Sequence, residues 1–241
     1  MNILAIGAHP DDIEIGCGGT LIRAARAGHD IYLYVITHGE VGGDPEQRMK
    51  ELFMAANYIT AKKLWLDNFP DARLAVNAEL IYHIESIITK CNPNLILTHS
   101  RHDPHHDHRA VSLSTIESAR RVPNILAYEN PTSIRFNPQV YLDISQVVED
   151  KLSLIRAFSS QNHRAYTTKR AIKGLAEYRA LQSRNHLVSH AEAFEVVKVM
   201  FDEDFSLLKT PTMTNLPKNM KYDVSKILEI PLERNEVAVK E

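Results

Sequence analysis

Three polar residues directly follow the first apolar run of the chain and could act on a metal ion. The run Asn2 to Ala8 leads into the turn AHPDDIEIGCGGT, so His9, Asp11 and Asp12 stand at the carboxyl end of a predicted strand. An imidazole and a carboxylate three residues apart can both face one ion, and the adjacent carboxylate then remains free for proton transfer. The alternative is a helix cap, in which Asp11 or Asp12 accepts hydrogen bonds from the first N–H groups of the next helix.

A second cluster of imidazoles follows the fourth predicted strand. Five of the twelve histidines fall within ten residues of the segment THSRHDPHHDHRA, namely His99, His102, His105, His106 and His108. Taken alone, such a cluster could be a solvated loop or an adventitious metal site. Together with the AHPDD turn it favours one shared site, because the loops beyond two adjacent parallel strands meet at the same edge of a sheet.

Alternating short apolar runs and segments of helical period must position these loops. The predicted strands are Asn2 to Ala8, Ile31 to Thr37, Lys63 to Leu66, Asn94 to Thr98 and Ile125 to Tyr128. The predicted helices are Gly18 to Ala27, Pro45 to Tyr58, Ala78 to Lys90 and His108 to Arg120. Continuous apolar strands in this order predict an α/β, Rossmann-like three-layer sandwich with a mostly parallel sheet of order 3-2-1-4-5, in which strands one and four flank the reversal point.

The second half of the chain has a different pattern. A strand-like QVYLDIS, a helix from Gln146 to Phe158, a polar stretch and a helix ending near Ser183 precede the apolar segment AEAFEVVKVM. The final stretch carries proline and charge with little periodicity. We therefore predict one domain over residues 1–200 and a C-terminal extension or arm over residues 201–241.

Composition excludes several classes of protein. With 44% hydrophobic and 24% charged residues the chain is neither disordered nor a coiled coil, and a net charge of -2 gives no reason to expect nucleic acid or an anionic membrane as a partner. No apolar run approaches the roughly 18 residues of a membrane span. The two cysteines, Cys17 and Cys91, cannot form a disulfide framework, and the N-terminus lacks the pattern of a signal peptide. We expect a reduced, cytoplasmic protein.

The motifs resemble a known family when they are taken in order. AHPDDIEIGCGGTL resembles the first signature of the LmbE-like (PIG-L type) zinc-dependent N-deacetylases, and HHDH at 105–108 resembles their HPDH signature, with His106 where proline is usual. Further matches are RMKE at 48–51, NFPDARL at 68–74 and HAEAFE at 190–195, so the resemblance extends from about Met1 to Glu195.

The resemblance implies a role for each matching residue. His9, Asp12 and His108 would bind zinc (Zn²⁺), with Fe²⁺ or another divalent metal as alternatives, and Asp11 would be the general base. His105, when protonated, would stabilise the tetrahedral oxyanion, and Asp107 would orient it. His106 is a rival for the histidine roles in this loop. Arg48 would contact the substrate, with a surface ion pair to Glu51 or Glu46 as the alternative. Asp71 would help to line the substrate pocket, with an Asx turn as the alternative.

The resemblance also implies an activity and an assembly. We expect a hydrolase that uses zinc-activated water to remove acetyl from an N-acetylated sugar or amino-sugar conjugate of the N-acetylglucosaminyl type, in a homo-oligomer that is a trimer or a hexamer. The alternatives are an amidase or deacetylase for a larger or non-sugar acyl group, and a metal-binding protein without activity. A nucleotide-dependent oxidoreductase is disfavoured, because the first strand end lacks GxGxxG and its two carboxylates would repel a pyrophosphate.

Overall fold

The structure is a computed structural model, and it describes residues 1–200. The C-terminal extension or arm that we predicted over 201–241 lies outside the described residues. Within residues 1–200, no helix is both long and apolar enough to cross a lipid bilayer.

A seven-stranded sheet of order β3-β2-β1-β4-β5-β7-β6 forms the centre of the fold. Strands β1 to β5 pair in parallel, whereas β7 is antiparallel to both of its neighbours, β5 and β6. The strands are β1 (Asn2–Gly7), β2 (Asp30–Thr37), β3 (Lys63–Phe69), β4 (Leu95–His99), β5 (Asn124–Tyr128), β6 (Val140–Asp143) and β7 (Ala191–Lys198). The predicted order 3-2-1-4-5 is confirmed, and the sheet continues with two antiparallel strands from the second half of the chain.

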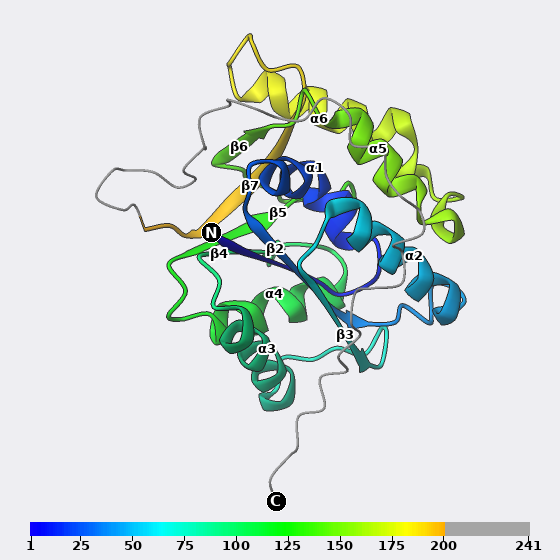
Figure 1. The fold of residues 1–241 in the computed structure, drawn as a ribbon, viewed down its shortest axis with the longest axis vertical. Helices are drawn as coiled ribbons and strands as arrows, with labels where there is room; N and C mark the ends of the chain where they lie inside the picture. Colours follow the sequence, from blue (N-terminus) through cyan, green and yellow to red (C-terminus); the bar gives the residue numbers. More distant parts are fainter. Residues whose placement is uncertain (201–241) are drawn as a thin grey trace, which may run out of the picture.

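Helices cover both faces of this sheet, which gives the predicted three layers (Figure 1). Helices α1, α2, α5 and α6 pack on one face, and α3 and α4 pack on the other. Their bounds are α1 (Asp12–Arg26), α2 (Pro45–Ile59), α3 (Ala78–Cys91), α4 (His106–Ser118), α5 (Val148–Arg156) and α6 (Lys169–Gln182). Two short 3-10 helices, η1 (Ser159–Gln161) and η2 (Ala165–Thr167), lie between α5 and α6.

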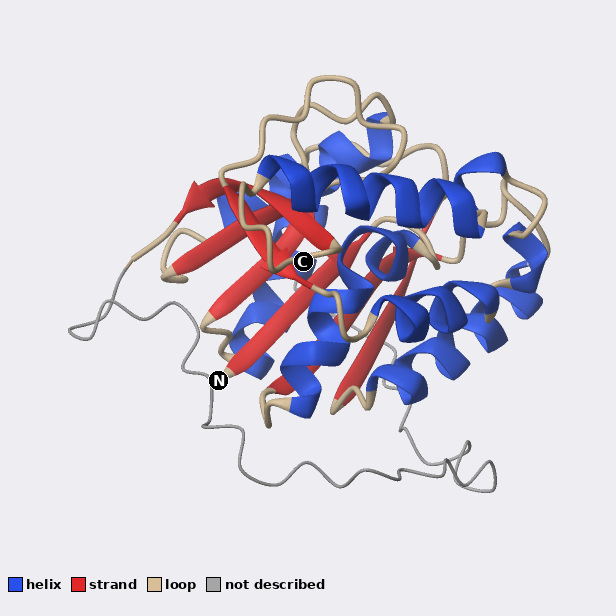
Figure 2. Cartoon of the chain, turned by 90° about the horizontal axis from the view of Figure 1, so that it is seen from above, coloured by secondary structure: helices blue, strands red, loops and turns tan. Residues whose placement is uncertain are grey.

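The central strands are apolar throughout because they bury side chains on both faces. In β1, Ile3 and Ala5 belong to the apolar core beneath α1 and α2, whereas Leu4 and Ile6 belong to the core beneath α3 and α4. Figure 2 shows the strands side by side between the two layers of helices. Each strand is thus fixed from both sides, and so are the loops at its ends.

The first helix begins at Asp12 and not at Gly18, where its apolar period becomes visible. The first turns of α1 contain glycines where other helices have apolar side chains, because α1 packs closely against neighbouring elements there. The apolar period is therefore not visible before Gly18. A side chain at Gly16 would overlap the ring of Tyr128, and the backbone at Cys17 departs from helical geometry with φ of -140°. The α1 helix is therefore kinked one turn after its start.

The reversal of strand order between β1 and β4 creates a crevice beside these two strands. These strands pair in parallel, yet α1 leaves β1 toward one face of the sheet and α4 leaves β4 toward the other. The loops beyond the two strands therefore diverge, and a crevice opens at the carboxyl ends of the strands. His9, Asp11 and Asp12 of the first cluster lie there, together with His105 and His108 of the second, whereas His102 and His106 are exposed and do not line this crevice.

Candidate active site

The proposed metal ligands from the two loops come together in this crevice. His9 and Asp12 follow β1, and His108 lies in the first turn of α4. Asp12 Oδ2 is 3.2 Å from His9 Nδ1, and Asp12 Oδ1 is 3.3 Å from His108 Nε2. One ligand atom from each of the three buried residues lies within 4.8 Å of the others. Two imidazoles and one carboxylate at this spacing can bind a single divalent cation.

The second nitrogen of each imidazole contacts a carboxylate that is not one of the three donors. His9 Nε2 lies 2.9 Å from Asp71 Oδ1 and 3.1 Å from Asp107 Oδ2. His108 Nδ1 lies 3.2 Å from Asp103 Oδ1. Such contacts fix the tautomer of a metal-binding histidine and raise its basicity. They leave His9 Nδ1 and His108 Nε2 for a cation, so the donor chemistry fits a divalent metal.

Burial and neighbouring charges set the protonation of the donors. Burial acts to raise the pKa of Asp12, but the surrounding imidazoles, above all that of His108, bring it well below its usual range. Burial likewise opposes a charge on His108, yet the carboxylates of Asp12 and Asp103 raise its pKa to about 9. Asp12 therefore remains ionised, as a carboxylate ligand must be.

Asp11 has the properties that a general base requires. Burial, supported by the charge of Asp12, raises the pKa of its carboxyl group to about 7, although Arg48 acts in the opposite direction. Its backbone has φ of 106°, a conformation that non-glycine residues rarely adopt, and such backbone strain is concentrated at functional sites. A carboxyl group that titrates near neutrality can both accept and release a proton at the working pH.

The two proposed substrate-binding residues both line the cleft, but Nη1 and Nη2 of Arg48 and both carboxylate oxygens of Asp71 already bind protein groups. Arg48 is 4% exposed; its Nη1 donates to the carbonyl oxygen of Gly39 at 2.7 Å and its Nη2 to that of Pro10 at 2.6 Å. A side chain at Gly39 would overlap this guanidinium. Asp71 Oδ2 accepts the N–H of Val41 at 2.9 Å, in addition to the contact of Oδ1 with the first histidine. Arg48 thus braces the turn that carries Asp11, and contact with substrate remains a prediction for both residues.

Asp107 was expected to orient His105, and the structure gives its carboxylate other partners. Oδ2 lies beside His9 Nε2 and accepts the N–H of Ala72 at 2.8 Å, while Oδ1 accepts the N–H of Leu74 at 2.9 Å. The backbone N–H of Asp107 donates to His105 Nδ1 at 3.2 Å. The helix start explains this difference: the free N–H of the first turn faces the cap residue His105, whereas the carboxylate faces the loop after β3.

The structure separates the roles open to the two adjacent histidines. His105 lines the cleft, and its ring centroid lies 5.0 Å from that of His9 and 4.6 Å from that of His108. His106 is half exposed and contacts Asp107 Oδ1 at 2.8 Å, outside the residues that line the cleft. Burial and the charge of His108 lower the pKa of His105. His105 can still donate a hydrogen bond, because Nδ1 accepts one and the ring proton then resides on Nε2.

Three further buried groups near the site were not assigned a role from the sequence. Asp103 contacts His108, as described above, and lies within the His-rich segment. His99 Nε2 accepts the N–H of Ala8 at 3.0 Å, and its ring stacks on that of His108 with centroids 3.9 Å apart. Both carboxylate oxygens of Glu14 are buried without a hydrogen-bond partner, and burial raises its pKa to about 8. The residue types were visible in the motifs, but these contacts depend on the fold.

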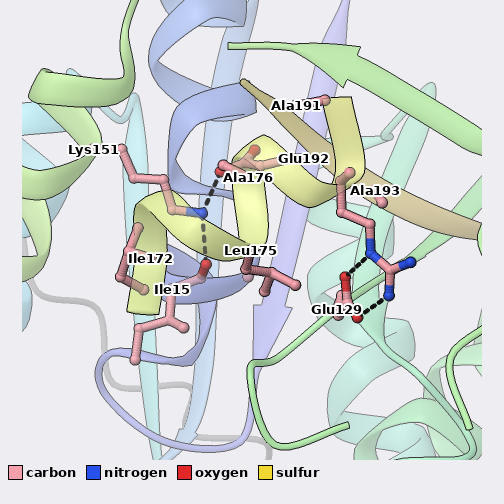
Figure 3. Close-up of a pocket in the computed structure, with 11 residues that line it drawn as sticks. Ile15, Glu129, Lys151, Ile172, Leu175, Ala176, Ala191, Glu192 and Ala193 are labelled. Atoms are coloured by element: carbon pink, nitrogen blue, oxygen red, sulfur yellow. Dashed lines mark hydrogen bonds and ion pairs between the residues drawn. The ribbon is translucent and has the colours of Figure 1, made fainter. Parts of the chain in front are cut away.

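A buried ion pair between Lys151 and Glu192 binds the backbone of the first half of α1 (Figure 3). Lys151 Nζ donates to the carbonyl oxygen of Ile15 at 2.7 Å and to Glu192 Oε1 at 2.6 Å. Glu192 accepts the N–H groups of Gly19 and Thr20 at 2.8 and 2.7 Å. The kink would leave these backbone groups unpaired, and the ion pair satisfies them. Glu192, which the HAEAFE motif contains, thus stabilises the helix that presents Asp11 and Asp12.

A cleft of about 500 Å³ opens over the cluster of donors. It is large enough for a small-molecule substrate. Its walls combine the loops after β1, β2, β3 and β4 with segments after β5 and α5. The residues that line it are His9, Asp11, Asp12, Ile15, Val41, Gly42, Arg48, Asp71, Ala72, Pro104, His105, His108, Asn130, Pro131, Thr132, Gln161, Arg164 and Tyr166.

Fold and site together define an α/β protein whose cleft holds two imidazoles and one carboxylate that can bind a divalent cation, next to a second carboxyl group. Residues 4–119 match the PIG-L family model, described as GlcNAc-PI de-N-acetylase. The chain is 37% identical over 153 residues to the uncharacterized deacetylase YaiS of Escherichia coli (strain K12), a match that covers 60% of this chain and 82% of that protein. This chain belongs to the PIG-L (LmbE-like) family of deacetylases.

Two further comparisons agree with this assignment. The chain is 30% identical over 185 residues to the diacetylchitobiose deacetylase of Thermococcus kodakarensis, which covers 66% of this chain and 69% of that protein. The crystal structure of the conserved protein TT1542 from Thermus thermophilus superposes with a TM-score of 0.75 at 25% identity, over 85% of this chain and 98% of that chain. The fold is therefore shared along almost the whole described chain.

Proposed function

We propose that this protein is a zinc-dependent N-deacetylase that hydrolyses the acetamide of an N-acetylated sugar or amino-sugar conjugate and releases acetate and a free amine. One observation carries the proposal: His9, Asp12 and His108 offer three donor atoms within 4.8 Å of one another, beside the Asp11 carboxyl group and in one cleft. The deacetylase relatives support the reaction class, and the diacetylchitobiose deacetylase supports an amino-sugar substrate.

Asp11 and His105 have separate roles in the proposed amide hydrolysis. When bound, zinc polarises the acetyl carbonyl and lowers the pKa of water to about 7. Asp11, whose pKa of about 7 suits the task, takes the proton of the attacking water. His105 donates a hydrogen bond from its Nε2–H group to the developing oxyanion, a contribution of roughly 3 kcal/mol for one donor. A proton must then reach the leaving amine.

The decisive experiment is a turnover assay with purified protein. N-acetylated sugar conjugates, N-propionyl analogues and non-sugar acetamides are incubated with the protein, and free carboxylate and amine are both quantified. We expect acetate release from the sugars, loss of release with a chelator, and recovery when zinc is restored. Elemental analysis of the purified protein distinguishes zinc from iron.

Two variants complete the test. Asp11→Asn should keep the bound metal and lose most turnover, whereas Glu117→Gln changes an exposed carboxylate at the far end of α4 and serves as the matched control. Absence of acetate release from every compound by the zinc-loaded wild-type protein would refute the proposal. Equal turnover by Asp11→Asn would refute the role given to Asp11.

A further inference from the structure

The lining of the cleft contains a second arginine, which lies outside the family motifs. Arg164 precedes η2, and it lies outside residues 4–119 that match the family model. With Gln161 and Tyr166 it forms the part of the lining that follows α5. These three residues are therefore candidates for recognising a part of the substrate that differs between members of the family.

The guanidinium of Arg164 has fewer protein partners than that of Arg48. The Arg48 guanidinium binds two backbone carbonyls, as described above, and its Nη2 also lies 3.4 Å from Asp11 Oδ1. Arg164 donates from Nε to Gln161 Oε1 at 2.7 Å, and its guanidinium lies 5.9 Å from the ring centroid of Tyr166. None of the ion pairs formed among residues 1–200 includes Arg164. A half-buried guanidinium of this kind retains donors and charge for an anionic ligand.

A rigid support fixes Arg164 in the cleft. Gln161 is 1% exposed, and its Nε2 donates to the carbonyl oxygen of Gly42 at 3.3 Å. The neighbouring Ser160 donates its N–H and its hydroxyl to the buried carboxylate of Glu51, at 2.9 and 2.6 Å. The segment is thus attached to the middle of α2 and to the loop before it. A preorganised arginine loses little conformational entropy on binding.

The position of Arg164 relates it to the reacting group. Gly42 also lines the cleft, and a side-chain carbon there would lie 3.4 Å from Arg164 Nη2, so the guanidinium stands in van der Waals reach of the loop before α2. The charge of Arg164 also acts to lower the pKa of Asp11. An anion held by Arg164 would therefore occupy the same cleft as the acetamide that Asp11 serves.

We propose that Arg164 forms an anion subsite, so that the substrate carries a carboxylate or a phosphate in addition to its N-acetylated amino sugar. This inference rests on the proposed deacetylase function and deepens it. The planar fork of the guanidinium can bind two oxygens of either anion at once. Gln161 holds the guanidinium through Nε, a contact that does not use the two terminal nitrogens.

Three substrates that share N-acetylglucosamine test the subsite: a neutral methyl glycoside, an O-glycoside of a hydroxy acid, and a sugar phosphate. Wild-type protein should hydrolyse at least one anionic substrate with higher kcat/KM than the methyl glycoside. Arg164→Gln should reduce the ratio of anionic to neutral kcat/KM roughly 10- to 100-fold, mainly through KM, because a charge-assisted contact is lost. Arg164→Lys should fall between the two, and the larger of the two anionic preferences identifies carboxylate or phosphate.

The control variant is Arg170→Gln, which removes an exposed arginine of α6 outside the lining of the cleft and should leave the ratio unchanged. Binding of the same three compounds is measured by calorimetry, separately from turnover. Hydrolysis with equal kcat/KM for neutral and anionic substrates, or an anionic preference that survives in Arg164→Gln, would overturn the subsite and leave the deacetylase function standing. An Arg164-dependent preference in binding without hydrolysis of any substrate would instead refute the deacetylase function and support the subsite.

Discussion

Carboxylates around the proposed donors determine which nitrogen of each imidazole would face a bound cation. Asp103 is 2% exposed; its Oδ1 contacts His108 Nδ1 and also accepts the N–H of His105 at 2.8 Å. We predict that Asp103→Asn weakens zinc affinity roughly 10- to 100-fold, because the amide holds the His108 tautomer less firmly than the charged carboxylate. Competition with a chromophoric chelator measures this affinity. The Glu117→Gln protein is the control, and unchanged affinity in Asp103→Asn would contradict the role of Asp103.

A second prediction at this scale concerns the buried carboxyl group of Glu14. Burial raises its pKa in the folded protein to about 8, from an ordinary value of 4.5. The folded state therefore keeps a proton that the unfolded state has lost, and stability falls as pH rises between these values, by up to roughly 1.4 kcal/mol per pH unit. Above the pKa of Glu14 in the folded protein, this loss of stability is complete and no longer changes with pH. Below the pKa of Glu14 in the unfolded chain, there is no loss.

Glu14→Gln should remove this dependence. We expect the free energy of unfolding of the variant, relative to wild type, to increase from pH 5 to pH 8 when both are measured by urea denaturation in the presence of a chelator. Chelation keeps metal binding from contributing to the difference. Two curves that stay parallel over this range would show that Glu14 is ionised in the folded protein.

The residue types of the site could be predicted from the sequence, but several of their contacts could not. His9, Asp11 and Asp12 follow directly from a strand end and a turn. The Asp107 carboxylate, by contrast, contacts the N–H groups of Ala72 and Leu74, more than 30 residues earlier, because the loop after β3 folds across the start of α4. Local spacing contains no information on such a contact.

At the scale of the elements, the kinked α1 depends on the ion pair between Lys151 of α5 and Glu192 of β7. Their side chains are almost fully buried and bind the backbone on both sides of Cys17. We predict that Glu192→Gln lowers the free energy of unfolding by about 3 to 5 kcal/mol, because it leaves the Lys151 ammonium buried without a counter-charge. Urea denaturation measures the loss.

The double variant Lys151→Met, Glu192→Gln should recover part of this stability, since it removes the buried charge altogether. Lys62→Met, which breaks an exposed ion pair with Asp30, is the matched control and should have a far smaller effect. If Glu192→Gln were as stable as the wild-type protein, the kinked α1 would not depend on the ion pair between Lys151 and Glu192.

The same elements show where sequence patterns stop being informative. The parallel strands could be predicted because each is a continuous apolar run and these runs alternate with helical segments. The strand QVYLDIS was also visible, but its neighbour is β7, which enters the sheet between β5 and β6 about 50 residues later along the chain. Antiparallel insertion of this kind depends on pairing between distant segments, and local periodicity does not encode it.

For the whole molecule, the reversal of strand order joins two segments that lie about 95 residues apart in the chain, His9 with Asp12 and His108. Each face of the sheet has its own apolar core, and neither core includes these donors. We therefore predict that the protein folds without metal and that metal adds to its stability by binding only the folded state. Zinc at 100 times its dissociation constant should contribute about 2.7 kcal/mol.

Thermal unfolding with chelator and with added zinc tests this linkage. The midpoint should rise with free zinc concentration in the wild-type protein, since the unfolded chain cannot bring the distant donors together. His108→Ala should unfold at a temperature that does not depend on zinc, because the two donors left after β1 cannot anchor the loop after β4. Unfolding of the wild-type protein at 25 °C on chelation alone would contradict this view, because the fold would then depend on the metal and not on its two cores.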